Sequence, residues 1–380
     1  FGATGDLIEK KVAPALYHLF KKKKLPDHFK VVGFSRQKLS NEDFKERVFD
    51  MLAKHKDIDI KMCTDFCDMI SYQAGEFPNK ADYSGLAKAL KKIDDDWGQC
   101  SNKLFYLAVP PKFYETIFKN LAVSGLTKPC SFEEGWSRVI VEKPFGNDLK
   151  TAEKLDMMLN KLFKEEQIYR IDHYMGKEMI QNILSFRFSN NLFEQTWDKN
   201  SIEKIEIFLN ETIGVEDRGS FYDSVGTLED VGQNHLLQIL SLVTMEQPTS
   251  LEASEIRKKR ADILKTLIPL TQKDIKSSTY RAQYKGYRKI DGVDSSSQTE
   301  TYFKLKLFLS DNRFSGVPII MEGGKKLKTL KKGVEITFKH PMLCLCPKED
   351  KKHFTNKVSI SFEPEESIKI DFWSKKPGFD

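Results

Sequence analysis

Short apolar runs and helix-like stretches alternate through the first 170 residues, and this pattern narrows the fold more than any other feature. The clearest runs are KVVGF (30–34), LFYLAV (104–109) and RVIVEKP (138–144). One intervening helix is signalled by Ser40 and Asp43, residue types that cap helix N-termini. Strands that are apolar throughout are typical of a parallel sheet covered by helices on both faces. The first half is therefore predicted to be a Rossmann-like, doubly wound α/β domain.

After residue 170 the strands change to a strict alternation of apolar and polar residues. This alternation is present in IEKIEIFLNE (202–211), TYFKLKLFL (301–309), VEITF (334–338), KVSISFEP (357–364) and SIKIDFW (367–373). Strands with one wet face predict a large, mainly antiparallel sheet. Helices are expected at 172–187 and 230–246, and the polar stretch 276–300 is expected to be loop or short helix. The sequence thus predicts two domains, residues 1–170 and an α+β domain at 171–380.

The composition argues against membrane-spanning and nucleic-acid-binding proteins. Of the 380 residues, 40% are hydrophobic and 31% are charged, and no run approaches the roughly 18 apolar residues of a membrane span. The formal net charge of +6 comes from 61 basic and 55 acidic residues scattered over the chain, without a basic stripe. No nucleic-acid or membrane partner is therefore expected.

The cysteines favour a reduced, cytoplasmic protein. They are Cys63, Cys67, Cys100, Cys130, Cys344 and Cys346. None forms the repeated CxxC spacing of a zinc site. Cys344 and Cys346 near His340 could hold a metal, but the favoured interpretation is reduced thiols throughout and no metal site, because scattered cysteines in a long lysine-rich chain are typical of the cytosol.

A glycine-rich turn, GATGDL (Gly2–Leu7), opens the chain. Glycines where a strand turns into a helix let the backbone approach a pyrophosphate at the helix N-terminus. Thr4 replaces the second glycine of the regular GxGxxG motif, so a tight turn without a ligand is an equal alternative for this motif alone. Only Phe1 remains of the strand that should precede the turn, so the first strand is expected to be truncated.

GFSR (33–36) lies at the end of the second expected strand, where dinucleotide sites distinguish their cofactors. An acidic residue there binds the ribose hydroxyl of NAD, whereas an arginine suits the 2′-phosphate of NADP. The position offers Ser35 and Arg36 and no acid. Alone, Arg36 is a surface arginine; together with GATGDL it predicts NADP, and Thr4 could add a hydroxyl to the same phosphate. Lys143, at the end of a later strand, would place a charge at the ligand crevice.

RIDHYMGKE (170–178) concentrates charged and polar groups in nine residues. In a helix, His173 and Lys177 would lie at i,i+4 and Tyr174 and Lys177 at i,i+3, so the three would be neighbours. A histidine, a tyrosine hydroxyl and a lysine that converge predict a clamp for an anion, with phosphate as the obvious ligand. The plain alternative is a helix start with solvated polar residues.

DVGQNHLLQ (230–238) places His235 at the start of an apolar helical run. In a continuous α-helix, His235 lies about 140° around the axis from Asp230, so the two are not partners on one face. A buried core histidine is the common alternative, and a general base in a partly dry site is the other. Asp172 is predicted to orient and charge-stabilise His235, as an aspartate does in a catalytic triad, while a nicotinamide accepts a hydride.

Together, several segments resemble the glucose-6-phosphate dehydrogenase family. They are FGATGDL, LFYLAVPP, VIVEKPFGNDL, RIDHYMGKEMIQN, RGSFYDSVGTLEDVGQNHLLQ and GVPII…GGK, in the order of the family. The resemblance implies oxidation of glucose 6-phosphate to 6-phosphogluconolactone with reduction of NADP, the first step of the oxidative pentose phosphate pathway. It also implies that the second domain binds substrate and forms the dimer interface through its sheet, hence a homodimer or homotetramer.

The resemblance assigns a role to each candidate residue. His235 is implied to be the catalytic base, and Asp172 its partner. The implied phosphate-binding residues are His173, Tyr174 and Lys177. The implied sugar contacts are Lys143, Glu211, Asp230 and Lys325. The implied cofactor contacts are Gly2, Thr4, Gly5, Asp6, Leu7, Arg36 and Lys143.

The sequence departs from the family in three places. Both ends are shorter than usual, so the C-terminus is also expected to be truncated. Leu330 stands where the family often has a phosphate-binding base, with Lys328 and Lys331 as candidate substitutes. Glu322 stands where animal enzymes have an arginine for a second, structural NADP, so no such NADP is expected.

Two other functions stay open at this point. One is a dehydrogenase that uses NAD, both cofactors or another hexose phosphate. Arg36 favours NADP over NAD, although some family members with this arginine also accept NAD. The other is a non-catalytic relative that acts as a scaffold. The Asp172–His235 pair argues against the scaffold, because such a protein has no reason to keep its base.

Overall fold

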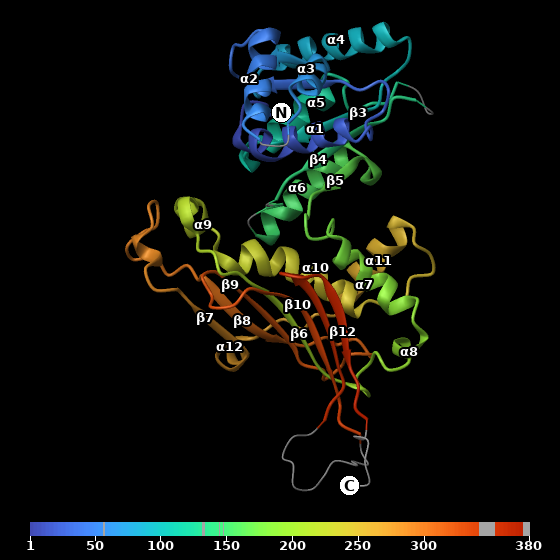
Figure 1. The fold of residues 1–380 in the computed structure, drawn as a ribbon, viewed down its shortest axis with the longest axis vertical. Helices are drawn as coiled ribbons and strands as arrows, with labels where there is room; N and C mark the ends of the chain where they lie inside the picture. Colours follow the sequence, from blue (N-terminus) through green and yellow to red (C-terminus); the bar gives the residue numbers. More distant parts are fainter. Residues whose placement is uncertain (56–57, 131–133, 144, 147, 342–353, 375–380) are drawn as a thin grey trace. The chain divides into compact units, whose positions relative to one another are not determined.

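The computed structural model describes the chain except residues 56–57, 131–133, 144, 147, 342–353 and 375–380 (Figure 1). It separates into two compact units, Phe1–Ile171 and Asp172–Asp380. The division lies beside the position where the strand pattern of the sequence changes.

The N-terminal unit contains two parallel sheets, as the apolar runs predicted. One pairs β1 (Val31–Ser35) with β2 (Ile70–Ala74), and the other has the order β3 (Lys103–Leu107), β4 (Ser137–Val141), β5 (Ile168–Arg170). Phe1 and Gly2 connect the two sheets. The N–H of Gly2 donates to the carbonyl of Phe34 at 2.9 Å, and the carbonyl of Phe1 accepts from Ala108 at 3.1 Å.

Helices supply two separate cores in this unit. The helices are η1 (Ile8–Val12), α1 (Ala13–Lys21), α2 (Asn41–Ala53), α3 (Ile60–Asp68), α4 (Lys80–Trp97), η2 (Pro111–Phe113), α5 (Tyr114–Val123), α6 (Leu149–Leu162) and η3 (Glu165–Gln167). Side chains of α1, α2 and α3 form one buried cluster, and those of α4, α5 and α6 form the other. The N-terminus of α2 is where the sequence predicted it, because Ser40 and Asp43 form a reciprocal capping box.

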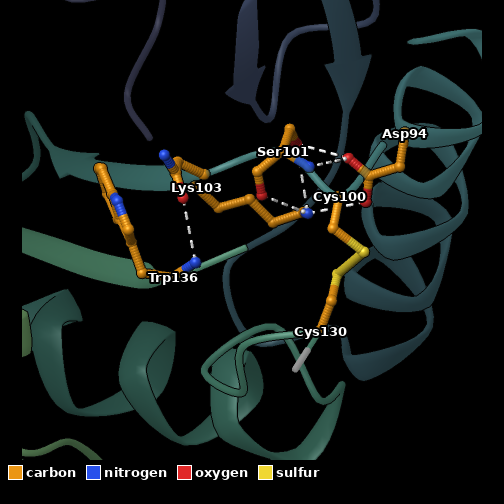
Figure 2. Close-up of a disulfide and its surroundings, with 7 residues drawn as sticks. Asp94, Cys100, Ser101, Lys103, Cys130 and Trp136 are labelled. Carbon is orange, nitrogen blue, oxygen red and sulfur yellow. Dashed lines mark hydrogen bonds and ion pairs between the residues drawn. A yellow bond between two sulfur atoms is a disulfide. The ribbon is translucent and has the colours of Figure 1, made fainter. Parts of the chain in front are cut away.

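Cys100 and Cys130 form a disulfide, so the expectation of reduced thiols is wrong for this pair (Figure 2). Cys100 precedes β3 and Cys130 precedes β4, and these two strands are parallel neighbours. Proximity therefore follows from strand pairing, which the spacing of cysteines does not report. Cys63 and Cys67 are free and buried, whereas Cys344 and Cys346 lie outside the described residues.

The C-terminal unit is built on a seven-stranded sheet with the order β12-β11-β10-β6-β9-β8-β7. Its strands are β6 (Ile202–Asn210), β7 (Thr279–Ala282), β8 (Tyr302–Leu307), β9 (Ile319–Gly324), β10 (Lys331–Phe338), β11 (Lys357–Glu363) and β12 (Ser367–Asp371). Every pairing is antiparallel except that of β6 with β9. The predicted antiparallel sheet is thus confirmed, but β9 was missed, and β7 lies within a stretch expected to be loop or short helix.

Helices α7 (Glu178–Phe188) and α10 (Leu237–Thr244) cover one face of this sheet (Figure 1). The other helices of the unit are α8 (Asn191–Glu194), η4 (Glu216–Arg218), α9 (Gly219–Asp223), η5 (Leu228–Leu236), α11 (Ala253–Leu264), α12 (Gln272–Ser278) and η6 (Tyr287–Lys289). Ile180 and Ile183 of α7 and Leu240 of α10 share one buried cluster with Ile207 of β6 and Ile336 of β10. None of the helices in the described ranges is long and apolar enough to cross a membrane.

Candidate active site

The centre of the candidate site is the pair of His235 and Asp172. Nδ1 of His235 lies 2.8 Å from Oδ1 of Asp172, and the same oxygen accepts the N–H of Tyr174 at 2.9 Å. Burial raises the pKa of Asp172, but the hydrogen bond and the charge of His235 outweigh burial, so the pKa lies below its ordinary value. A carboxylate at this distance can hold a proton on Nδ1 of the buried imidazole, and in that tautomer Nε2 is the nitrogen that can accept a proton.

A π-helix, η5, positions His235. Its hydrogen bonds run from residue i to i+5, whereas those of an α-helix run to i+4. The angle of about 140° between Asp230 and His235 was predicted for a continuous α-helix, and the wider turn of the π-helix makes this angle smaller. Single π-helical turns inside α-helices are frequent at functional sites. Periodicity alone could not reveal this turn, because an apolar pattern fits either helix.

Residues 172–177 form a pair of turns. The helix expected at 172–187 is therefore wrong over its first six residues. The N–H of Met175 donates to the carbonyl of Asp172 at 3.1 Å, and that of Lys177 to Tyr174 at 2.9 Å. The Asp172 side chain competes with helical bonding by accepting a neighbouring N–H, as short polar side chains do. Helix α7 begins only at Glu178.

The turns still bring the three predicted anion-clamp residues together. The ring of Tyr174 stacks on that of His235 with centroids 4.3 Å apart, and His173 meets His235 edge-on at 4.6 Å. Nζ of Lys177 lies 4.7 Å from the centroid of Tyr174. Ligand atoms of Asp172, His173 and His235 lie within 4.8 Å of one another and could hold a metal, although general-base chemistry needs none.

A row of alternating charges crosses the end of the large sheet beside these residues. In order, it contains Lys325, Glu211, Lys332, Glu363 and Lys177. Nζ of Lys332 lies 3.1 Å from Glu211 and 2.7 Å from Glu363. The first four residues follow the order of their strands, β9, β6, β10 and β11, so sheet topology places them in this row.

Burial and charge set the protonation states in this row. Burial raises the pKa values of Glu211 and Glu363, but the paired lysines outweigh it and hold both below the ordinary value. Burial lowers the pKa of Lys332, but its two glutamates outweigh burial and raise it. Burial raises the pKa of Tyr174 to about 12, so its hydroxyl stays protonated at neutral pH and can donate to an anion.

Lys332 and Glu363 lie in the candidate site, and the sequence analysis did not name them. The two lysines named there as candidate substitutes for the base at position 330 lie outside the row of charges. Lys328 is exposed, and Lys331 lies over the ring of Phe208 at 3.8 Å and pairs with Glu335. The alternation of β10 could have found Lys332, because the buried residues Val334 and Ile336 follow it at intervals of two.

The residues that the resemblance assigned to the sugar fall in both units. Lys143 follows β4 in the N-terminal unit, whereas Glu211, Asp230 and Lys325 belong to the C-terminal unit. Glu211 directly follows β6 and Lys325 directly follows β9. These strands are parallel neighbours, so the two residues reach the same end of the sheet. Asp230 lies in η5, five residues before His235.

The predicted cofactor turn lies in the N-terminal unit. Gly2 has a φ of +76°, and a Cβ there would lie 2.3 Å from the carbonyl oxygen of Ala108, so only glycine fits. The N–H of Gly5 donates to the Gly2 carbonyl at 3.0 Å and closes the turn. Asp6 and Leu7 then begin the helix, whose first N–H groups are donors of the kind that hold a phosphate.

Hydroxyl groups of Thr4, Ser35 and Tyr72 form a chain beside this turn. Thr4 Oγ1 lies 3.1 Å from Ser35 Oγ, which lies 2.8 Å from the Tyr72 hydroxyl. Arg36 follows Ser35 and is exposed at the end of β1. Arg47 of α2 donates to the carbonyl of Thr4 at 3.2 Å and holds the turn. The sequence pattern did not indicate that Arg47 contacts this turn, because Arg47 is one of several charged residues in α2.

Glu322, where a structural NADP would need a positive charge, is engaged within the sheet. It accepts from the side-chain amide of Asn210 at 2.8 Å and pairs with Lys304 at 3.2 Å. Its carboxylate would repel a phosphate, which supports the prediction that this chain binds no structural NADP.

Comparison with known proteins agrees with the motifs in both units. The family model described as glucose-6-phosphate dehydrogenase, NAD binding domain, matches residues 1–182, and the C-terminal domain of the same family matches 184–380. A glucose-6-phosphate 1-dehydrogenase from Aggregatibacter actinomycetemcomitans is 41% identical, over 100% of this chain and 77% of the relative.

Plant and structural relatives agree. The cytoplasmic glucose-6-phosphate 1-dehydrogenase 6 of Arabidopsis thaliana is 36% identical over 100% of this chain and 73% of its own length. The solved structure of a glucose-6-phosphate dehydrogenase in complex with its substrate glucose-6-phosphate superposes with a TM-score of 0.88 at 34% identity, covering 100% of this chain and 78% of that one. The chain belongs to the glucose-6-phosphate dehydrogenase family.

Proposed function

We propose that the chain oxidises glucose 6-phosphate at C1 to 6-phospho-D-glucono-1,5-lactone, with His235 as the general base and NADP as the hydride acceptor. Glucose-6-phosphate dehydrogenase activity is the activity of its family. The observation that carries the residue assignment is the buried His235–Asp172 pair, which adjoins a clamp of anion-binding side chains. Nε2 of His235 takes the proton of the C1 hydroxyl, and bound nicotinamide supplies the acceptor for the hydride.

Asp172 acts through His235. Its carboxylate fixes the imidazole and stabilises the imidazolium that forms when the proton arrives. The lowered pKa of Asp172 supports this role, because the carboxylate then stays charged at the pH where the base works. Water exclusion strengthens the interaction, since His235 is only 2% exposed.

The remaining polar residues hold the sugar phosphate. His173, Tyr174 and Lys177 donate to the phosphate, which places charge-assisted hydrogen bonds on a dianion. Other side chains are assigned to the sugar hydroxyls, and these are Lys143, Glu211, Asp230 and Lys325. The carboxylates accept from hydroxyl groups and the lysines donate to hydroxyl oxygens.

The N-terminal unit matches a dinucleotide-binding domain, and NADP is the proposed cofactor. The turn at Gly2 admits no side chain, as close approach of a pyrophosphate to the backbone requires. The hydroxyls of Thr4 and Ser35 lie together beside this turn, and the exposed guanidinium of Arg36 follows them. These groups would hold the 2′-phosphate that distinguishes NADP from NAD.

We also propose that this reaction is the first step of the pentose phosphate pathway. The protein is proposed to act as a homodimer or homotetramer that assembles through the large sheet. No nucleic-acid or membrane partner is involved. The proposed location is the cytoplasm, which accords with the name of the Arabidopsis thaliana relative. The cytoplasm is a reducing compartment, which favours thiols at Cys100 and Cys130 over the disulfide of this structure. The redox state of these two cysteines in the cell therefore bears on the proposed location.

Absorbance at 340 nm tests the function directly. The purified protein is mixed with NADP and either glucose 6-phosphate or glucose, and the same pair is repeated with NAD. We expect rapid reduction of NADP with the phosphorylated sugar and much slower reduction with glucose, because glucose lacks the clamped group. A folded protein that reduces neither cofactor would refute the proposed activity.

Arg36→Ala tests the choice of cofactor. We expect KM for NADP to rise on the order of 10- to 100-fold, whereas KM for NAD changes little, because only NADP loses a charge-assisted phosphate contact. Lys38→Ala is the matched control, since Lys38 is also an exposed cation two residues away. An unchanged ratio of the two KM values would show that another group recognises the phosphate.

A further inference from the structure

Lys332 is a buried cation to which the proposed function assigns no role. Its side chain is 9% exposed, yet it lies between the carboxylates of Glu211 and Glu363 at 3.1 and 2.7 Å. Lysine is almost never buried without a partner, and two carboxylates satisfy it here. Each of those carboxylates is also shared, Glu211 with Lys325 and Glu363 with Lys177.

Strand geometry aims Lys332 toward the catalytic pair. On β6, its cross-strand partner is Leu209, whose side chain belongs to the core under the helices. Its partner on β11 is Glu363, and the register shifts between Lys332 and Gly333. Such bulges redirect side chains near active sites. Lys331, the preceding residue, faces the other side of the sheet, where it covers Phe208.

Tyr174 connects Lys332 to the proposed chemistry. Burial raises the pKa of its hydroxyl, the charge of Lys332 acts against this larger effect and lowers the pKa, and its ring stacks on the imidazole of His235 with centroids 4.3 Å apart. Lys177 lies over the same ring at 4.7 Å. Two ammonium groups, one from α7's N-terminus and one from β10, therefore approach a single tyrosine beside the base.

The charges in this row do not cancel. Three lysines, Lys177, Lys325 and Lys332, meet two glutamates, Glu211 and Glu363, so one positive charge is left over. Glu363 bridges Lys177 and Lys332 with one oxygen to each. A phosphate dianion carries more charge than this carboxylate and has three acceptor oxygens, so it can replace Glu363 between the two lysines.

We propose that Lys332 binds the phosphate of the substrate together with Lys177, and that Glu363 is the counter-ion that this phosphate displaces. The inference rests on the proposed function and adds two residues to its phosphate clamp. Lys332, on the core face of β10, thereby supplies the phosphate-binding basic residue that is missing at position 330, where this chain has leucine. Glu363 keeps the two ammonium groups apart and paired while no phosphate is present.

The test compares Lys332→Met with Lys331→Met, adjacent lysines on opposite faces of β10. We expect Lys332→Met to raise KM for glucose 6-phosphate on the order of 10- to 100-fold, the usual size of a lost charged hydrogen bond. Its kcat/KM for glucose should stay within about threefold of wild type, because glucose has no phosphate. Lys331→Met should match wild type, and Lys332→Arg should recover most of the lost affinity.

Glu363→Gln gives a result of opposite sign. Removing the competing charge should tighten the binding of inorganic phosphate by about two- to tenfold, whereas Lys332→Met should weaken it. Titration calorimetry with inorganic phosphate measures this binding without turnover, so it tests the clamp even if the proposed reaction fails.

Two results would overturn the inference. One is unchanged phosphate binding in Lys332→Met. The other is an equal loss of activity toward glucose and glucose 6-phosphate, which would show that Lys332 only stabilises the end of the sheet. Failure of wild type to reduce NADP would instead count against the proposed function.

Discussion

Replacing His235 with asparagine should lower kcat by about 10²- to 10⁴-fold and change KM little, because general-base catalysis contributes a factor of this size. Asparagine can still hydrogen-bond to Asp172, but it cannot take a proton from the C1 hydroxyl at neutral pH. The measurement is the rate of NADP reduction at saturating glucose 6-phosphate. His18→Asn is the control, since His18 is an exposed histidine in the other unit.

The variant must be shown to be folded, because His235 is buried and its ring stacks on Tyr174. A thermal midpoint close to that of wild type and an unchanged dissociation constant for glucose 6-phosphate would meet this condition. Under that condition, wild-type turnover would remove His235 from the role of base.

Asp172→Asn should lower kcat by about 10²- to 10⁴-fold, because an asparagine amide can hold the wrong tautomer of the imidazole and carries no charge to stabilise the imidazolium. Residues that act as one unit are not additive. The double variant with His235→Asn should therefore be about as slow as His235→Asn alone. Full additivity of the two losses would show that Asp172 and His235 act independently.

The same variant changes how stability depends on pH. The pKa of Asp172 is lowered in the folded protein, so its contribution to stability is present above the ordinary value of about 3.9 and is lost as pH falls through the folded value. Urea unfolding of wild type and Asp172→Asn between about pH 6 and pH 3 should therefore give curves that converge as the pH falls. A constant gap between them would contradict the pairing of Asp172 with His235 in the folded state.

Patterns that depend on neighbours in sequence could be predicted well. Apolar runs identified β1, β3 and β4, and alternation identified β6, β8, β10, β11 and β12, because both signals come from which faces are buried. The parallel strands β2 and β5 were not identified. The capping box at Ser40 likewise fixed the start of α2. In contrast, β7 is four residues long in a polar stretch, and β9 ends in two glycines, so neither shows enough alternation.

Features that depend on distant partners could not be predicted from pattern alone. Lys332 gains its surroundings from β6, β11 and the turn at Tyr174, which lie far from it in sequence. The contact between Cys100 and Cys130 comes from the pairing of β3 with β4. The turns at 172–177 formed where a helix was expected, because Asp172 binds its own backbone as well as His235.

The π-helical segment η5 also gives the chain room to lose one residue beside the proposed catalytic pair. A π turn accommodates one residue more than an α turn, so η5 behaves as a local insertion. Deleting one residue between 228 and 234 would let the segment close as an α-helix, and the flanking chain would keep nearly its present direction because the wider turn already absorbs the extra residue. The contact between His235 and Asp172, which is 2.8 Å in this structure, would therefore be kept. A one-residue alignment gap at this place is thus compatible with an intact pair, whereas a substitution of His235 is not.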